Sequence, residues 1–393
     1  MKPRSLLILV LVLSTVAVFA QKAAEPNKKL SDRIDAAIAG FKGKVWVYAK
    51  NLDTGKDYSL RADEPVRTAS TIKLAILAET FHQIAQGKIK WDDEIVLTKE
   101  KKKGGSGILF EFSDNTKIDL RTAVHLMIVL SDNSATNLVL DKVTTDSVND
   151  FMDTLGLKQT RSLRKVFGGG ESKAWDDPAN KPFGLGRSSP RDMVRLLEMM
   201  EKGEVVSKEA SAEMIAILKH QQLKDGIGRG LPDAVESASK SGALDALRSD
   251  VGIIYSPHGR IAMAITIDEM PVVMYNQENP GLALIWKLSQ VLQEELATPY
   301  DAGVPVSDTF NSDYRPPNGY VPDEKTAIAI AVAAWIPIYG KENIEKEKPY
   351  KAVLKDGVWT VTGSLPKPFT LGGVAEAQIS QETGRILKII HGK

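Results

Sequence analysis

The sequence contains no cysteine, few histidines and almost no net charge, and each shortage excludes a class of function. The absence of cysteine excludes disulfides, Fe–S clusters, thiolate zinc sites, cysteine nucleophiles and an N-terminal lipid anchor on cysteine. The five histidines lie far apart, at positions 82, 125, 220, 258 and 391, without the short spacing of a metal site. A net charge of +1 favours neither nucleic acid nor an anionic surface. We therefore expect no metal, no cofactor and no nucleic-acid partner.

Residues 1–20 have the pattern of a signal peptide. Lys2 and Arg4 supply positive charge, and the apolar run 6–19 is short for a membrane span. Val18-Phe19-Ala20 resembles a cleavage site. The alternative is an uncleaved membrane anchor. We expect the mature protein to work outside the cytoplasm, in the periplasm or as a secreted protein.

Changes in composition divide the rest of the chain into three parts. Residues 21–298 alternate apolar helices with strand-like segments, residues 299–323 are rich in Pro, Asp, Asn and Ser and predict a linker, and residues 324–393 form a small unit of one helix and four strands. In the large part, strand patterns lie near both ends, at residues 43–50, 58–60, 250–255 and 260–267. This order predicts an α/β (α+β) domain whose antiparallel sheet is formed by both ends of the chain, followed by a small C-terminal α+β module.

The stretch Arg67–Leu77 predicts the start of a central, buried helix, because most of its later residues are apolar. Ser70 lies in the first turn and Lys73 three residues later, so both side chains lie on one face. The helix dipole and burial both disfavour an ammonium there, and a lysine held near its neutral form can take a proton from serine. The pair can thus supply a nucleophile without histidine. Other Ser-x-x-Lys copies, such as Ser162/Lys165, do not open an apolar helix.

Two further polar clusters stand in apolar surroundings. Ser131-Asp132-Asn133-Ser134 separates the apolar helices predicted at 120–130 and 135–143, where each unpaired buried group would cost roughly 1–3 kcal/mol. Lys240-Ser241-Gly242-Ala243 precedes the strand at 250–255. The glycine-rich run 104–107 predicts a flexible turn into a strand-like segment, and it lacks the lysine and the helix of a phosphate loop.

The motifs Ser70-Thr71-Ile72-Lys73, Ser131-Asp132-Asn133 and Lys240-Ser241-Gly242, in this order, resemble those of the class A β-lactamases and the penicillin-binding serine transferases. Neighbouring stretches also resemble these families, among them Arg248-Ser249-Asp250-Val251-Gly252-Ile253. The resemblance covers about residues 30–297. It implies a β-lactamase/transpeptidase-like fold and acyl transfer to serine, and it assigns roles to the motif residues.

By this resemblance, the first two motifs carry the chemistry. Ser70 would attack a strained lactam carbonyl or a peptide-like carbonyl, with Lys73 as base or proton relay. Ser131 would pass a proton to the leaving nitrogen. Asn133 would hold the substrate amide and Lys73.

By the same resemblance, the third motif binds the substrate. Lys240 and Ser241, followed by Gly242, would bind a substrate carboxylate, with Arg248 as a second cation. The backbone N–H of Ala243 would complete an oxyanion hole with that of the nucleophile.

One departure from the family concerns the loop after the second motif. Family β-lactamases carry a glutamate there, which activates the water that releases the acyl group. Aligning Thr160–Arg164 with that loop places Val166 at or near the glutamate position, and Glu171 is the nearest carboxylate. The sequence therefore predicts ready acylation and slow deacylation, unless Glu171 acts as the catalytic carboxylate. The other interpretation of Glu171 is a solvated loop charge.

The C-terminal unit resembles the nuclear-transport-factor-two-like fold of bacterial immunity-type proteins, mainly in Lys348-Pro349-Tyr350-Lys351, Asp356-Gly357-Val358-Trp359 and Gly384-Arg385-Ile386-Leu387. It shows no catalytic set, so we expect a module that binds an unknown protein or ligand. For the whole chain, expected to be a monomer, three functions stay open. They are a serine β-lactamase-type hydrolase, a cell-wall D,D-peptidase or penicillin-binding protein acting on peptidoglycan-like substrates, and a non-catalytic binding protein on the same fold.

Overall fold

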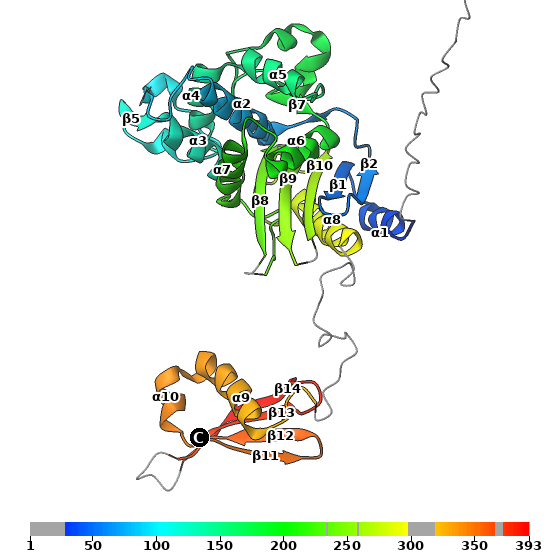
Figure 1. Cartoon of the computed structure of the whole chain (residues 1–393), viewed down its shortest axis with the longest axis vertical. Coiled ribbons are helices and arrows are strands. Elements are labelled where there is room, and N and C mark those ends of the chain that lie inside the picture. Colours follow the sequence, from blue (N-terminus) through cyan, green and yellow to red (C-terminus); the bar gives the residue numbers. More distant parts are fainter. Residues whose placement is uncertain (1–27, 233–234, 258, 298–318, 366–371, 393) are drawn as a thin grey trace, which may run out of the picture. The chain divides into compact units, whose positions relative to one another are not determined.

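The computed structural model describes residues 28–232, 235–257, 259–297, 319–365 and 372–392. The chain divides into two compact units, Met1–Ala302 and Gly303–Lys393, each with its own core (Figure 1). The predicted signal peptide and residues 299–318 of the predicted linker lie outside the described residues. Within the described ranges, no helix is long and apolar enough to cross a membrane.

A five-stranded antiparallel sheet, in the order β2-β1-β10-β9-β8, is the centre of the first unit. Its strands are β1 (Lys44–Asn51), β2 (Asp57–Leu60), β8 (Glu236–Leu244), β9 (Leu247–Ser256) and β10 (Gly259–Asp268). β1 pairs along its whole length with β10, from Lys44 opposite Asp268 to Asn51 opposite Ile261. Both ends of the unit therefore share one sheet, which confirms the predicted fold class.

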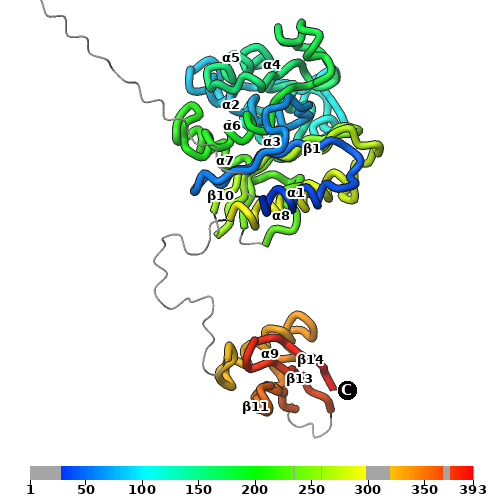
Figure 2. The backbone as a smooth tube through the Cα atoms, turned by 90° about the vertical axis from the view of Figure 1, so that its right-hand side faces the viewer, coloured from blue at the N-terminus to red at the C-terminus, as the bar shows by residue number. Residues whose placement is uncertain are grey.

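Helices α1 (Lys28–Ile38) and α8 (Pro280–Leu296) lie side by side against this sheet (Figure 2). They share one apolar core with the sheet, which includes Leu30, Ile34, Val47, Ile265, Ile285 and Leu288. Arg33 of α1 also forms ion pairs with Glu294 and Glu295 of α8. The two ends of the unit are thus joined by helix packing as well as by strand pairing.

A helical subdomain packs on the opposite face of the sheet. Its helices are α2 (Lys73–Ala85), α3 (Leu120–Val129), α4 (Asn133–Val143), α5 (Thr145–Thr154), α6 (Pro190–Lys202) and α7 (Lys208–Lys219). Every residue of α2 from Lys73 to Phe81 is buried, as the apolar pattern predicted. The buried Glu79 accepts a hydrogen bond from Gln83 at 2.6 Å, and Gln83 also donates to Val143 O at 3.2 Å. Polar groups inside this helix therefore have partners.

Short strands tie loop 163–185 to the segment that leads into α2. β3 (Val66–Arg67) pairs with β7 (Gly186–Ser188), which pairs with β6 (Arg161–Ser162). The interior of the loop forms 3-10 turns at Lys173–Asp176 and Pro178–Phe183. This anchoring holds both ends of the loop beside the start of α2.

Asp119 and Ser189 cap the N-termini of α3 and α6. Each side-chain oxygen accepts the backbone N–H three residues on, at 2.7 Å for Asp119 on α3 and 3.2 Å for Ser189 on α6. Asp119 also ends β5 (Thr116–Asp119), which pairs with β4 (Glu94–Leu97). The caps fix where the helices around α2 begin.

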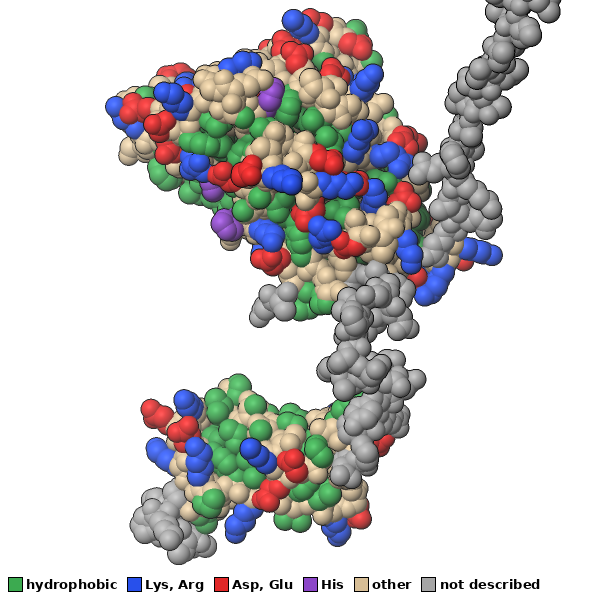
Figure 3. Space-filling model, viewed as in Figure 1, with side chains coloured by type: hydrophobic (Ala, Val, Ile, Leu, Met, Phe, Trp, Pro, Cys, Tyr) green, Lys and Arg blue, Asp and Glu red, His purple; other side chains and the backbone are tan. Residues whose placement is uncertain are grey.

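In the second unit, α9 (Glu324–Tyr339) packs on an antiparallel sheet of order β11-β12-β13-β14. The strands are β11 (Lys351–Lys355), β12 (Val358–Thr362), β13 (Ala375–Ser380) and β14 (Ile386–His391). Its core gathers around the fully buried Trp335 of α9. The long helix and four strands agree with the prediction, and a short helix, α10 (Lys341–Lys346), is added. On the face shown in Figure 3, basic and acidic side chains are interspersed over the first unit, and hydrophobic side chains gather on the second.

Candidate active site

Ser70 lies on a turn that leads into α2. The 3-10 turn Ala69–Ile72 precedes the helix, so Ser70 stands just before α2 and not within its first turn as predicted. Ala69 has a φ of +46°, a left-handed conformation that is unusual for a residue with a side chain. The Thr71 hydroxyl and amide both donate to Thr68 O, at 2.8 and 3.1 Å. These bonds hold the turn in shape.

Gly242 of β8 packs directly against the backbone of this turn. A Cβ atom at Gly242 would lie 2.8 Å from Thr68 O and 3.1 Å from Ser70 N. A side chain has no room at such distances. Glycine in the third motif is therefore what lets the strand reach the serine.

Lys73 joins the first motif to the second. Its fully buried ammonium donates to Ser131 O at 2.7 Å, to Ser131 Oγ at 3.1 Å and to Asn133 Oδ1 at 3.3 Å. Burial, and then the charge of Lys240, lower the pKa of Lys73 well below its usual value. A lysine whose pKa is lowered in this way loses its proton more readily and can act as a base.

Asp132 anchors the glycine-rich segment 104–109 over the second motif. Its buried carboxylate accepts backbone hydrogen bonds from two residues of this segment and from the first turn of α4, at 2.7–2.8 Å. A Cβ atom at Gly107 would lie 2.1 Å from Asp132 Oδ2. The prediction of a flexible turn into a strand-like segment is therefore wrong, because the segment is tied to Asp132 and continues into the 3-10 turn Leu109–Glu111.

Lys240 lies behind the cleft wall. Its side chain is fully buried, and its ammonium donates to Ser241 O at 2.7 Å. Burial lowers the pKa of Lys240 to about 7, with the charge of Asp250 opposing the shift, and burial raises the pKa of Asp250 to about 6. Ser241, Gly242 and Ala243 line the cleft, so Lys240 acts on it mainly through charge.

Arg248 lines the cleft opposite Ala243 on the neighbouring strand. Its Nη1 donates to Leu244 O and Leu247 O at 2.6 Å each, and its Nη2 donates to Met274 O. These bonds brace the end of the cleft. The guanidinium adds positive charge there, but several of its donors are occupied by backbone carbonyls.

A cleft of about 840 Å³ lies beside Ser70. Of the predicted site residues, those that line it are Ser70, Ser131, Asn133, Ser241, Gly242, Ala243 and Arg248. Among the described residues that line it, the only carboxylate belongs to Asp225. The structure therefore brings residues from all three motifs to one serine, with Lys73 and Lys240 behind the wall.

Val166 is one of the loop residues that line the cleft, whereas Glu171 does not line it. Val166 N donates to Asn137 Oδ1 at 2.9 Å, and Asn137 Nδ2 donates to Val166 O at 3.1 Å. Glu171 is exposed, and hydrogen bonds from its own amide and that of Gly169 hold the pKa of its carboxyl below the usual value. The glycines of the loop thus do not turn Glu171 toward Ser70.

Two buried polar residues that shape the site were not predicted. Asn137 fixes the backbone of Val166, and Asp250 lies behind Lys240 and accepts the Ile227 amide at 2.9 Å. Both are buried polar residues, Asn137 in α4 and Asp250 in β9. The sequence pattern did not single them out, because each stands beside other polar residues of its own segment, and only the fold shows which of these are buried and need a partner.

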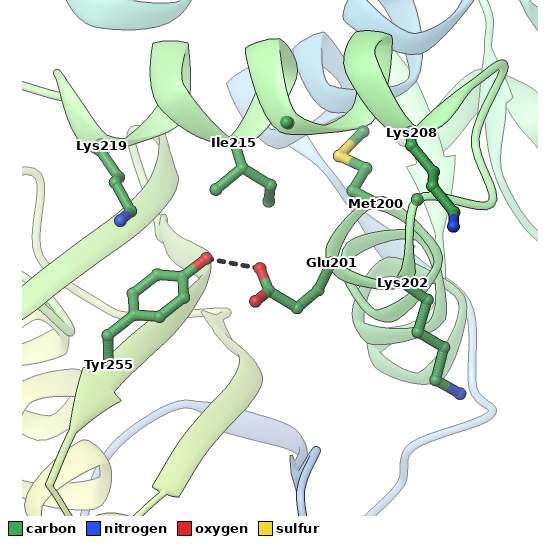
Figure 4. Close-up of a pocket in the computed structure, with 9 residues that line it drawn as sticks. Met200, Glu201, Lys202, Lys208, Ile215, Lys219 and Tyr255 are labelled. Carbon is green, nitrogen blue, oxygen red and sulfur yellow. Dashed lines mark hydrogen bonds between the residues drawn. The ribbon is translucent and has the colours of Figure 1, made fainter.

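A second pocket, at the C-terminal end of α6 and along α7, shares no lining residue with the cleft. Figure 4 shows Glu201 and Tyr255 pointing toward each other, and Tyr255 OH donates to Glu201 Oε2 at 2.7 Å. Lys219 Nζ lies 4.4 Å from the centre of the Tyr255 ring. No serine lines this pocket, and within the described ranges no cluster of His, Asp or Glu could hold a metal ion. The candidate active site is therefore the cleft at Ser70.

An antiparallel sheet joined to a helical subdomain, with a serine and a buried lysine at their junction, defines the β-lactamase and penicillin-binding class of serine hydrolases. Residues 29–296 match the model of the β-lactamase enzyme family, and the chain belongs to that family. Residues 326–393 match the model of the NTF2 fold immunity protein. Both resemblances noted in the sequence are thereby confirmed.

Several solved structures share the fold of the first unit. A β-lactamase from Sphaerobacter thermophilus is 28% identical, with a TM-score of 0.60, over 69% of this chain and 99% of that chain. PBP-A is 23% identical with a TM-score of 0.60, over 69% of this chain and 97% of its own. A class A β-lactamase from Mycobacterium abscessus is 20% identical with a TM-score of 0.59, over 68% of this chain and 98% of its own.

Two curated proteins match shorter stretches. The imipenem-hydrolyzing β-lactamase of Enterobacter cloacae is 24% identical over 135 residues, which are 34% of this chain and 46% of that protein. The uncharacterized protein YhhH of Escherichia coli (strain K12) is 38% identical over 55 residues, which are 14% of this chain and 43% of that protein. The chain thus spans about half the length of the curated relatives that it matches.

Proposed function

We propose that this protein is a serine β-lactamase-type hydrolase that forms an acyl-enzyme on Ser70 with β-lactams and releases it slowly. The observation that carries the proposal is the buried Lys73 ammonium, bonded to Ser131 and Asn133 beside the turn that holds Ser70. Membership of the β-lactamase family supports the serine-hydrolase class. The acyl-enzyme and its slow release are our proposal.

In the acylation step, neutral Lys73 takes the proton of Ser70 as the serine oxygen attacks the lactam carbonyl. The hydrogen bond of 3.1 Å between Lys73 Nζ and Ser131 Oγ gives that proton a path to the leaving nitrogen. The N–H groups of Ser70 and Ala243 stabilise the carbonyl oxygen as it gains negative charge, where the loss of one donor costs about 3 kcal/mol of barrier. Asn133 binds the amide of the substrate side chain.

Deacylation requires a base that activates a water molecule beside the ester. Val166 lines the cleft with a side chain that accepts no proton, and the Glu171 carboxylate is bonded to Gly169 N at 2.9 Å outside it. The ester on Ser70 should therefore be long-lived. A mutant of PBP-A, a protein of the same fold, has been solved as an acyl-enzyme complex with penicillin G, which supports an ester of this kind on this fold.

The alternative is a cell-wall D,D-peptidase or penicillin-binding protein, because the same serine chemistry opens a peptide bond. A chromogenic cephalosporin and a muropeptide that ends in D-alanyl-D-alanine separate the two functions. We expect a stoichiometric burst of cephalosporin opening, then slow turnover, and no release of D-alanine. Ser70→Ala should abolish the burst. Repeated release of D-alanine would establish the peptidase function. If neither compound reacts, the remaining alternative is a non-catalytic binding protein on the same fold.

Acylation should depend on pH through Lys240. Because burial sets the pKa of Lys240 to about 7, its charge is present below that pH and is lost above it. The loss of charge weakens the attraction for a substrate carboxylate and lets the pKa of Lys73 rise, so the second-order rate constant for acylation should fall as pH rises from about 7 to 9. Rates of acylation by benzylpenicillin across this range provide the measurement.

Lys240→Arg is the control for this pH dependence, because arginine stays charged throughout the range. In Lys240→Arg, the second-order rate constant for acylation should begin to fall only at a higher pH. A wild-type rate that stays constant between about pH 7 and 9 would show that Lys240 does not control acylation.

We further propose that residues 1–20 export the protein and that the second unit binds a protein or ligand. The unit presents apolar surface, with Ile338 of α9 exposed to 56% and hydrophobic side chains gathered on the face in Figure 3. This surface supports a docking role for the module, while the reaction takes place at Ser70.

A further inference from the structure

The exposed large apolar side chains of the first unit belong to loops that contribute to the cleft. Among its described residues, these are Ile108, Phe112, Phe167, Leu223, Val272, Val273 and Tyr275. They belong to four loops, and each loop lines the cleft, through Gly105, Phe167, Leu223 and Tyr275. Three of these side chains, Phe167, Leu223 and Tyr275, line the cleft itself. Exposed apolar side chains gathered at a cleft mark an interaction site, here one suited to a ligand with a large apolar group.

Phe167 is the most exposed of these side chains, at 70%. Its φ is +63°, a left-handed conformation that suits glycine or asparagine better than phenylalanine. The turn around it is closed by backbone bonds, from Gly168 N to Lys165 O at 3.1 Å and from Lys165 N to Gly169 O at 2.8 Å. These bonds fix the backbone at Phe167, and the exposed ring is left free to contact a ligand.

The ring of Phe167 lies close to Asn133. Its Cζ atom is 3.6 Å from the point where a Cβ atom of Gly105 would stand, and Asn133 Nδ2 is 3.4 Å from the same point. Asn133 is the residue proposed to bind the amide of the substrate side chain. A group attached to that amide is therefore within reach of the ring.

The part of the cleft at Tyr275 and Arg248 has a different character. Tyr275 OH donates to Asp245 Oδ1 at 2.7 Å, and the Tyr275 ring lies 4.7 Å from the Arg248 guanidinium. Tyr275 thus braces the positively charged end near Ala243. The charged end suits the substrate carboxylate, and the end with Phe167 suits an apolar acyl side chain.

We propose that Phe167 binds the acyl side chain of the substrate and that the site selects β-lactams whose acylamino group carries an aryl ring. This inference rests on the proposed acylation of Ser70 and names the substrate class of the same site. Two aromatic rings attract each other in offset or edge-to-face contact beyond the effect of buried area. An exposed ring beside the amide-binding residue can make that contact with an aryl substituent.

The test compares two penicillins that differ only in the phenyl ring: benzylpenicillin and 6-acetamidopenicillanic acid. The second-order rate constant for acylation is measured by the mass of the adduct for the wild type and for Phe167→Asn, whose asparagine tolerates the left-handed backbone. We expect Phe167→Asn to lower the rate with benzylpenicillin by about five- to tenfold and to leave the rate with the acetamido compound unchanged within about twofold. Phe167→Tyr keeps an aromatic ring and should retain the wild-type preference for benzylpenicillin over the acetamido compound.

Phe112→Asn is the matched control, because Phe112 is exposed to 41% but does not line the cleft. It should leave both rates unchanged. If Phe167→Asn lowers both rates equally, the residue shapes the loop and does not bind the aryl group, and the inference is overturned. It is also overturned if Phe167→Asn changes neither rate. If neither penicillin acylates the wild type, the proposed function itself is wrong, which is a separate outcome.

Discussion

Lys73→Met slows the acylation of Ser70 by about 10²–10⁴-fold, the usual contribution of a general base. The amine that methionine removes is buried, has a lowered pKa and is bonded to Ser131 and Asn133, so it is placed to move the serine proton. Methionine keeps a side chain of similar length but cannot donate to Ser131 or Asn133. Time-resolved mass measurement of the benzylpenicillin adduct gives the rate.

The stability of Lys73→Met separates loss of the base from loss of the fold. Because the pKa of Lys73 is lower in the folded protein than in the unfolded chain, protonation near neutral pH favours the unfolded state. Removal of the amine removes this cost but also the hydrogen bonds to Ser131 and Asn133, so we expect only a small change in the melting temperature. An acylation rate within about tenfold of the wild type would show that another group is the base.

Val166→Glu raises the rate of deacylation by about 10²–10⁴-fold and converts a protein that stays acylated into one that turns over. Asn137 bonds to both backbone groups of Val166, so the substitution changes the side chain on a fixed backbone that already lines the cleft. A carboxylate there can take a proton from water beside the ester. The decay of the benzylpenicillin adduct, followed by mass, is the measurement.

Val166→Gln is the matched control, because glutamine has the same shape without the basic carboxylate. It should deacylate as slowly as the wild type. Glu171→Gln should also leave both steps unchanged, because Glu171 is exposed and bonded to Gly169 outside the cleft. Rapid deacylation of the wild type that Glu171→Gln abolishes would restore Glu171 as the catalytic carboxylate.

The elements with strong periodicity were predictable from the sequence. The segment after Ser70 is apolar on almost every side, which only a central helix satisfies, and α2 is buried from Lys73 to Phe81. The apolar strands near both chain ends predicted the shared sheet, which β1 and β10 form. α5 was missed, because Thr145–Thr154 has few large apolar residues and its burial depends on the helices around it.

The details of the site depend on contacts between distant segments, which a local pattern does not contain. The run 104–107 was interpreted as flexible because glycine permits many conformations, whereas its glycine at 107 is required by the approach of Asp132. Lys240 was expected to bind a substrate carboxylate together with Ser241, and no local pattern indicated that its buried ammonium would bond to Ser241 O while Ser241 lines the cleft. Whether the Glu171 side chain points toward Ser70 could not be predicted, because glycines precede it and tertiary contacts set the conformation of a glycine-rich loop.

The most direct test of the central claim is to find where a penicillin attaches. The protein is incubated with benzylpenicillin, its intact mass is followed over time, and a tryptic digest locates the modification. We expect one adduct per chain, persistent after removal of free penicillin, on the peptide Thr68–Lys73 and absent from Ser70→Ala. An adduct on another peptide, an adduct that survives in Ser70→Ala, or no adduct at all would contradict the assignment of Ser70 as the nucleophile.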